Sequence, residues 1–305
     1  MSGPGFTSQV EPAYFHVRTE PRPYRPQGDL LFGVLALGLT TRTPVHVGTG
    51  APRIVPLEGG GDVVVSGMTE TPTGSRAGKD GEGPAEPRAV VPGSSVKGAV
   101  RAVFEALTSS CAVTTSSCGG KKGAKDGLCA ACQTFGAQGL RGRVGFDEVV
   151  FPVPPVEVVR FPQRYGGRAR DTKLRRFYKP KPERSEASDM EAVLCVEAGV
   201  EARLRVRIAG IDRPSAGALV AALGLVEGTM PYLRLGGGKN RGLGIVDVRF
   251  KEGWVGSDAT APVLGKTKPL ASEDLASWVQ EARQVFTPGF DEVLADLRQG
   301  YEEGL

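Results

Sequence analysis

Apolar and polar residues recur along this chain at the two spacings that distinguish strands from helices. Runs of β-forming residues and positions that alternate between apolar and polar predict strands, whereas apolar positions three or four apart predict helices. The predicted strands are residues 30–39, 62–65, 144–151, 191–196, 202–208 and 245–248. The predicted helices begin near residues 94, 214, 272 and 288, the first with Ser94 or Ser95 as its N-cap.

The order of these elements predicts an α+β fold. A strand, a helix, further strands, a second helix and a last strand are compatible with a ferredoxin-like or RRM-like βαββαβ core. We place this core in residues 29–250, with a cysteine-rich insertion at 111–132 and a basic insertion at 152–190. Residues 1–28 are rich in proline and predict an extended arm without regular elements. Residues 251–305 predict a linker and C-terminal helices that pack either on the core or on a neighbouring protein.

Length and composition narrow the class of protein. The 305 residues are enough to bury a substantial core, and no apolar run approaches the length that spans a bilayer. The N-terminus lacks the order of cationic, apolar and small residues that marks a signal peptide. We therefore expect a cytoplasmic protein without a membrane partner.

A glycine-rich loop between the last predicted helix of the core and the last strand is the strongest candidate binding element. Five glycines in residues 233–244 admit positive φ angles, so that main-chain N–H groups can converge on a phosphate. The loop matches neither a Walker A motif nor a dinucleotide fingerprint, because Asn240 follows the lysine and a strand follows the loop. The alternative is a flexible glycine hairpin with solvated cations. The predicted contacts are Gly236, Gly237, Gly238, Lys239, Asn240, Arg241 and Gly242.

The start of the first helix is a second candidate anion site. Its free N–H groups lie at Gly93, Ser94 and Ser95, and a helix N-terminus attracts anions. Lys97 and Arg101 are four residues apart and share one face of the helix. A capped helix without a ligand is the alternative interpretation.

The segment 160–184 is the most basic part of the chain, with ten cationic residues and two acidic ones. Arg164, Arg168 and Arg170 precede the aromatic pair Phe177 and Tyr178. Aromatic rings stack on exposed bases while cations follow the phosphates, so this mixture is typical of single-stranded nucleic-acid binding. A solvated basic loop remains the alternative.

Four of the five cysteines lie within 22 residues, at Cys111, Cys118, Cys129 and Cys132. Such clustering in an intracellular protein favours thiolate coordination of a structural Zn²⁺ over disulfides. Because four thiolates leave no open coordination position, we expect no chemistry at this metal. A Cys-x-x-Cys redox pair is the alternative, and Cys195 is expected to be a buried bystander.

Three motifs together resemble one protein family. Residues 91–101, the glycine loop 235–244 and the turn 43–48 are similar to motifs of the RAMP superfamily of CRISPR-associated proteins. Within it, the chain resembles the backbone subunits of type III effector complexes over about residues 30–250. The resemblance implies a multi-subunit ribonucleoprotein for antiviral defence, with guide RNA, complementary target RNA and other effector subunits as partners. It also implies that the basic insertion forms a thumb-like hairpin and that His46 and Gly48 lie near RNA.

Some subunits of this type cut target RNA with an acidic residue in the loop after the first strand. Carried to this chain, the resemblance gives Asp62 as the catalytic candidate, which could orient the 2′-hydroxyl of the target or hold a divalent ion such as Mg²⁺. The alternative for Asp62 is an ordinary surface residue. Two other functions stay open, a stand-alone metal-dependent RNA endonuclease and a non-enzymatic zinc-stabilised scaffold. The central hypothesis is that both glycine-bearing bends and the basic insertion lie on one RNA-binding surface.

Overall fold

The structure, a computed structural model of the chain, describes most of the sequence. The described residues are 14–18, 22–56, 60–71, 87–111, 118, 127–155, 157–162, 174–180, 190–261 and 266–303. The strands are β1 (Tyr14–Arg18), β2 (Leu30–Thr41), β3 (Gly48–Pro56), β4 (Asp62–Met68), β5 (Val90–Val91), β6 (Val144–Phe146), β7 (Val149–Val150), β8 (Glu157–Pro162), β9 (Leu174–Tyr178), β10 (Met190–Cys195), β11 (Glu201–Asp212), β12 (Leu233–Arg234), β13 (Ile245–Gly256) and β14 (Lys268–Pro269). The helices are α1 (Gly93–Leu107), α2 (Ala130–Phe135), α3 (Arg213–Leu223), the 3₁₀ turn η1 (Lys239–Arg241), α4 (Ser272–Val285) and α5 (Phe290–Glu302).

A central sheet carries the fold. Its strand order is β12-β13-β2-β11-β6, with β14 paired to β13, and β2 is antiparallel to both β11 and β13. Alternate residues of β2, such as Leu35, Leu37 and Leu39, are fully buried, while the residues between them are half-buried. In β11 the same alternation buries Leu204 and Val206 and exposes the arginines between them. The alternation that predicts these strands therefore also separates a core face from an exposed face.

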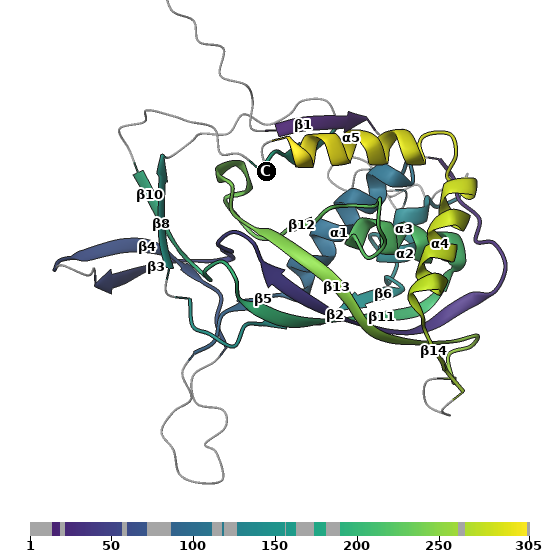
Figure 1. Cartoon of the computed structure of the whole chain (residues 1–305), viewed down its shortest axis with the longest axis horizontal. Coiled ribbons are helices and arrows are strands. Elements are labelled where there is room, and N and C mark those ends of the chain that lie inside the picture. The colour runs from purple at the N-terminus through teal and green to yellow at the C-terminus, as the bar shows by residue number, and fades with distance from the viewer. Residues whose placement is uncertain are drawn as a thin grey trace, which may run out of the picture.

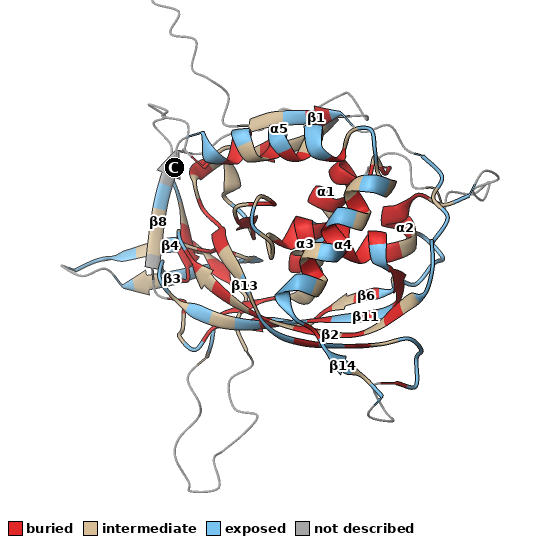
Figure 2. Cartoon of the chain, turned by 45° about the vertical axis from the view of Figure 1, so that its right-hand side comes forward, coloured by how far each residue is buried: buried red, intermediate tan, exposed pale blue. Residues whose placement is uncertain are grey.

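Helices cover the core face of the sheet (Figure 1). Their buried sides face the sheet and one another, as Figure 2 shows. The helix α3 is almost wholly buried, and the Asp212 carboxylate caps it by accepting from the Ser215 backbone N–H at 3.3 Å. The C-terminal helices pack on the core: Trp278 of α4 is 3 % exposed, and Tyr301 of α5 accepts a hydrogen bond from Tyr232 at 2.5 Å through its carbonyl. This settles the choice that the sequence leaves open for residues 272–303.

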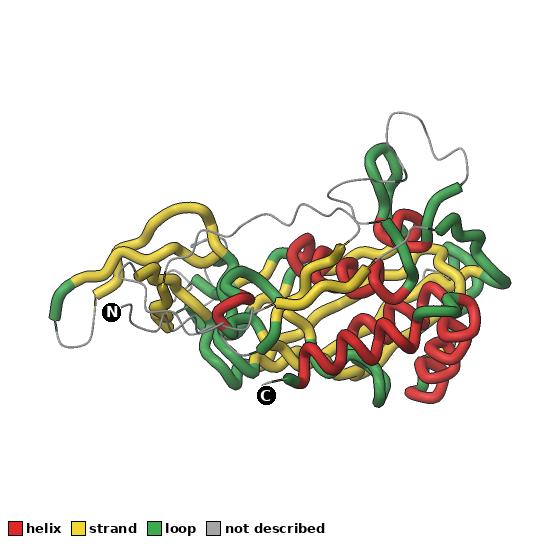
Figure 3. The backbone as a smooth tube through the Cα atoms, turned by 90° about the horizontal axis from the view of Figure 1, so that it is seen from above, coloured by secondary structure: helices red, strands yellow, loops and turns green. Residues whose placement is uncertain are grey.

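A second sheet, ordered β3-β4-β10-β8, extends from the central one. Figures 1 and 3 show the β3–β4 hairpin reaching away from the body at the end opposite α4. Among the described residues, β8 at the start of the basic insertion pairs antiparallel with β10 at its end, whereas β9 pairs with β1 from the arm. The thumb-like hairpin predicted for 152–190 therefore stays a prediction.

Three local predictions also need correction. Residues Tyr14–Arg18 form a strand within the arm for which the sequence predicts none, since β9 supplies hydrogen-bonding partners from outside the segment. The predicted strand 144–151 is broken into β6 and β7, which join different sheets. Pro92, not a serine, is the N-cap of α1, and no side chain caps that helix. None of the helices in the described ranges has the length and apolar content needed to cross a bilayer.

Candidate nucleic-acid interface and metal centre

One pocket of about 370 Å³ brings the predicted binding elements together. It is lined by the turn before β3, the start of α1, β9, β12, the glycine loop and α5. The predicted site residues that line it are Gly48, Ser94, Ser95, Phe177, Tyr178, Gly236, Gly237 and Lys239. Segments nearly 200 residues apart in the sequence thus line one pocket, and their common role in RNA binding stays a prediction. We call it the loop pocket.

The turn 43–48 holds the glycine loop in place. Gly236 has a φ of 75°, and a Cβ there would lie 2.0 Å from the carbonyl oxygen of His46, so only glycine fits. The Gly237 N–H donates to that same carbonyl at 2.8 Å. The His46 imidazole is buried, and its Nδ1 lies 2.7 Å from the Leu194 carbonyl oxygen. The His46 carbonyl therefore holds the glycine loop in place. The contact of His46 with RNA stays a prediction.

The start of α1 presents one face to the pocket and the opposite face to the interior. Ser94, Ser95 and Gly98 line the pocket. Lys97 and Arg101 do not, because they share the other face. Lys97 Nζ lies beside Gly142, and burial and Arg101 lower the pKa of its ammonium group. Lys97 remains a predicted RNA contact that the structure does not bring into the loop pocket.

Positive charge in the loop pocket comes mainly from residues outside the predicted set. Arg176, Arg234 and Lys239 line it, and no Asp or Glu is among its described lining residues. Arg234 is 4 % exposed and donates through Nη2 to the carbonyl oxygen of Lys239. Burial, with Arg234 nearby, lowers the pKa of Lys239 to about 8. The sequence signal for this charge is an arginine inside the apolar run 232–235.

The aromatic residues of the pocket belong partly to the core. Phe177 is 3 % exposed and stacks on Phe15 with ring centroids 5.7 Å apart. Its ring is therefore covered, and its role in base stacking stays a prediction. Tyr178 is half-buried at the pocket wall, while the Arg176 guanidinium lies over the Tyr14 ring at 4.4 Å. Tyr232 and Tyr301 also line the loop pocket, and the sequence analysis does not predict them.

The other predicted contacts either do not line the loop pocket or lie outside the described residues. Gly93, Gly238, Asn240, Arg241 and Gly242 belong to the two motifs but are not among the residues that line the pocket. Arg164, Arg168 and Arg170 lie outside the described residues.

Asp62 is exposed at the first position of β4, opposite Pro56 in the β3–β4 hairpin, and it does not line the loop pocket. Within the described ranges it belongs to no cluster of metal-ligating side chains. Its catalytic role therefore stays a prediction.

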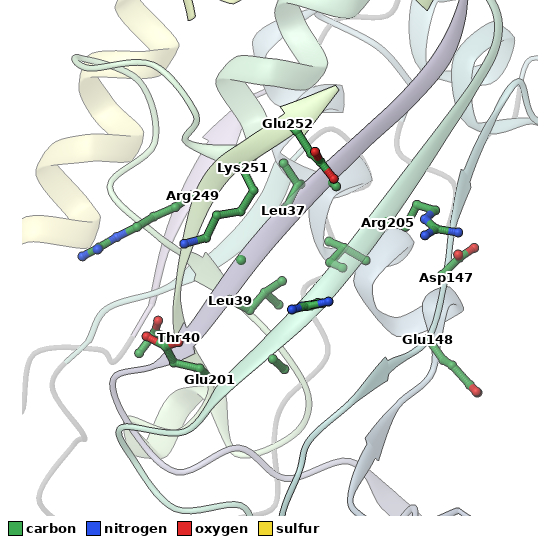
Figure 4. Close-up of a pocket in the computed structure, with 15 residues that line it drawn as sticks. Leu37, Leu39, Thr40, Asp147, Glu148, Glu201, Arg205, Arg249, Lys251 and Glu252 are labelled. Carbon is green, nitrogen blue, oxygen red and sulfur yellow. The ribbon is translucent and has the colours of Figure 1, made fainter. Parts of the chain in front are cut away.

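A larger cavity, of about 770 Å³, lies over the exposed face of the central sheet. Figure 4 shows Arg249 and Lys251 on one side of it and Asp147 and Glu148 on the other. Acidic and basic side chains are mixed here, so the field over this face does not favour a polyanion as the loop pocket does. We therefore place the candidate nucleic-acid interface at the smaller pocket.

The four clustered cysteines form a metal-binding constellation. The Sγ atoms of Cys111, Cys118, Cys129 and Cys132 all lie within 4.8 Å of one another. Tetrahedral zinc with bonds of about 2.3 Å holds its sulfurs about 3.8 Å apart. The distances of 3.3 Å from Cys111 to Cys132 and 3.6 Å from Cys129 to Cys111 fit that requirement and are too long for a disulfide.

A buried charge network joins this centre to α1 and β9. Arg101 donates to the Gly136 carbonyl at 2.8 Å and to the Glu105 carboxylate at 2.7 Å, and its Nη2 lies 3.8 Å from the Cys132 Sγ. Glu105 is fully buried and also pairs with Arg175 of β9. The Arg101 guanidinium is thus engaged inside the protein, and its predicted contact with RNA remains a prediction.

Comparison with known protein families shows which family the chain matches. The model of the RAMP superfamily matches residues 38–247, which include the turn 43–48, α1, the cysteine cluster and the glycine loop. No curated protein matches the chain. The match covers more than half of the 305 residues. This chain therefore belongs to the RAMP superfamily, whose members are CRISPR-associated proteins that work with RNA and other subunits.

Proposed function

We propose that this protein is a guide-RNA-binding backbone subunit of a type III CRISPR effector complex, with the loop pocket as a principal RNA contact. The observation that carries the proposal is the convergence of the α1 start, the glycine loop and β9 on one pocket whose described charged residues are all cationic. Such a pocket attracts the sugar-phosphate backbone and reads no base edges. Base pairing between guide and target then supplies the sequence specificity.

The order of elements supports a ferredoxin-like core as the scaffold. The chain runs β2, α1, β6, β11, α3, β13, and these strands are ordered β13-β2-β11-β6 with antiparallel neighbours. This is the arrangement of a βαββαβ unit. The start of α1 and the loop before β13 then lie at the same end of the sheet, which explains why both reach the loop pocket.

Structural zinc at the four cysteines is the second part of the proposal. The sulfur separations fit tetrahedral zinc, and four protein thiolates leave no position for a water or a substrate. The metal would stabilise the region after α1, where Cys111, Cys129 and Cys132 are buried. It would take no part in RNA chemistry.

A salt titration of RNA binding tests the proposal. We expect similar affinities for single-stranded RNAs of unrelated sequence and a steep loss of affinity as salt rises. Lys239→Gln should weaken binding and reduce the magnitude of the log–log salt slope by about 0.7, the contribution of one phosphate contact. Arg249→Gln removes a cation from the exposed sheet face and is the matched control. Strong base preference with a flat salt response would refute the proposal.

Purification of the intact assembly separates the other two functions. A stoichiometric small RNA with further effector subunits supports the guide complex. Cutting of free RNA by the isolated chain in Mg²⁺ would favour a stand-alone endonuclease. Protein partners without RNA would favour the zinc-stabilised scaffold.

A further inference from the structure

Arg234 is a buried cation whose hydrogen-bonding capacity is only partly used. One of its nitrogen atoms, Nη2, donates to the Lys239 carbonyl, whereas Nε and Nη1 are buried and have no hydrogen-bond partner in the described part of the chain. The side chain comes from β12, next to the central sheet, and lines the loop pocket. Arg234 is 4 % exposed, and burying N–H donors without hydrogen-bond partners costs free energy of folding unless an acceptor binds them.

The neighbours of Arg234 supply no such acceptor charge. Tyr232 interacts with Arg234 only through a neutral phenolic oxygen, and its hydroxyl donates to the Tyr301 carbonyl. Burial raises the pKa of Tyr232 to about 12 and also raises that of Tyr301, so neither phenol becomes an anion near neutral pH. Lys239 adds a second positive charge. Burial and repulsion by the nearby Arg234 lower the pKa of its ammonium group. The described lining includes no carboxylate that could balance the two cations.

We propose that Arg234 and Lys239 form an anchoring site for a single phosphate group, which enters the loop pocket beneath the glycine loop. The inference rests on the proposed RNA-binding function and adds to it the atom group that this pocket takes. The open N–H groups of the guanidinium can donate to phosphate oxygens, and the lysine ammonium adds a second charge-assisted donor. This contact is buried, whereas Ser94 of the same pocket is exposed.

A buried anchor fixes the register of the strand more firmly than exposed contacts do. Because Arg234 is 4 % exposed, an ion pair there is less screened by salt than pairs at the surface. Ser94 of α1 also lines the pocket, and no side chain caps the start of that helix. The strand would therefore be held at one defined phosphate and followed more loosely on either side.

The test uses two ligands on the full chain, inorganic phosphate and a single-stranded oligoadenylate. Thermal unfolding is measured in phosphate and in chloride at equal ionic strength, and RNA affinity is measured by fluorescence anisotropy. For the parent we expect Tm to rise by about 2 °C at a tenfold excess of phosphate over its Kd. For Arg234→Gln we expect that rise to vanish and RNA affinity to fall about ten- to a hundredfold, as charge-assisted hydrogen bonds are lost. Arg249→Gln should retain both properties.

The two ligands make the outcomes distinguishable. A phosphate-dependent rise in Tm that requires Arg234, without RNA binding by the parent, would support the phosphate site while refuting the proposed function. RNA binding by Arg234→Gln at parent affinity, or a parent without any phosphate-dependent rise, would overturn the inference and leave the proposed function standing. Should Arg234→Gln fail to fold, Arg234→Lys keeps the charge without the fork and must show a reduced phosphate-dependent rise. An undiminished rise in Arg234→Lys would also overturn it.

Discussion

The affinity of this protein for RNA should fall as pH rises through 8, because Lys239 loses its proton there. Burial and Arg234 lower the pKa of Lys239 from 10.5 to about 8 in the free protein. A phosphate binds the protonated ammonium more tightly, so binding and protonation are linked. Below pH 8 the lysine is already charged and the full affinity is present. Above it, binding must first take up a proton.

The size of the effect follows from the same pKa. If the lysine stays protonated in the complex, the observed Kd is multiplied by one plus ten to the power of pH minus 8. That factor is about 1 at pH 7 and about 11 at pH 9, so affinity should weaken about tenfold, or ~1.4 kcal/mol. The other charged groups that line the pocket are Arg234 from β12 and Arg176 from β9, and arginines stay protonated throughout this range.

Fluorescence anisotropy with an oligoadenylate is the appropriate assay, at constant ionic strength from pH 7 to pH 9. Lys239→Arg is the matched control, because its guanidinium keeps its charge and should give a flat profile. Lys239→Gln should be weak at every pH. An equally steep fall in Lys239→Arg would show that another group titrates. A flat profile for the parent would refute the linkage argued from the burial of Lys239.

Three further predictions concern the metal centre, the hairpin and the loop. Cys129→Ser should lower bound zinc and Tm, measured by metal analysis and thermal unfolding, whereas Cys195→Ser should leave the zinc content unchanged because Cys195 lies outside the cluster. Asp62→Ala should abolish target cutting in Mg²⁺ if Asp62 is catalytic, and parent-level cutting would remove it from consideration. Gly236→Ala should destabilise the protein by more than about 1–3 kcal/mol in denaturant melts, because the positive φ and the clash with a carbonyl add. Gly199→Ala, also at positive φ but in open space, should cost less than Gly236→Ala, and an equal loss would contradict the clash.

Local patterns predict the parts of this fold that depend on local chemistry. The alternation in 202–208 identifies β11 because one face of that strand is buried and the other carries arginines. The spacing of Val96, Val100 and Val103 identifies α1 because those residues face the core. The cysteine cluster is recognisable from spacing alone, and its four Sγ atoms do lie together.

Such local patterns do not predict which face of a helix or strand contacts which partner. Helical spacing places Lys97 and Arg101 together, but only packing decides that this face turns to Gly142 and Gly136 instead of the pocket. Strand partners can be equally nonlocal, since β9 pairs with β1 from the arm. Arg234 could not be predicted for the same reason. A lone arginine in a short apolar run is expected to be solvated, and only the fold shows that Arg234 is 4 % exposed at the loop pocket.

The cysteine cluster and the loop pocket are linked through α1. Four thiolates around one divalent cation leave a net charge of about −2, and a cation nearby offsets it. Arg101 supplies that cation at Cys132, and Glu105 then balances Arg101 one helical turn further along. Arg175 completes the chain of charges from β9, the strand that brings Arg176 and Tyr178 to the pocket. Because Glu105 is fully buried, loss of both arginines would leave an unpaired charge in the interior. This buried network therefore connects the cysteine cluster to β9, a strand that lines the loop pocket.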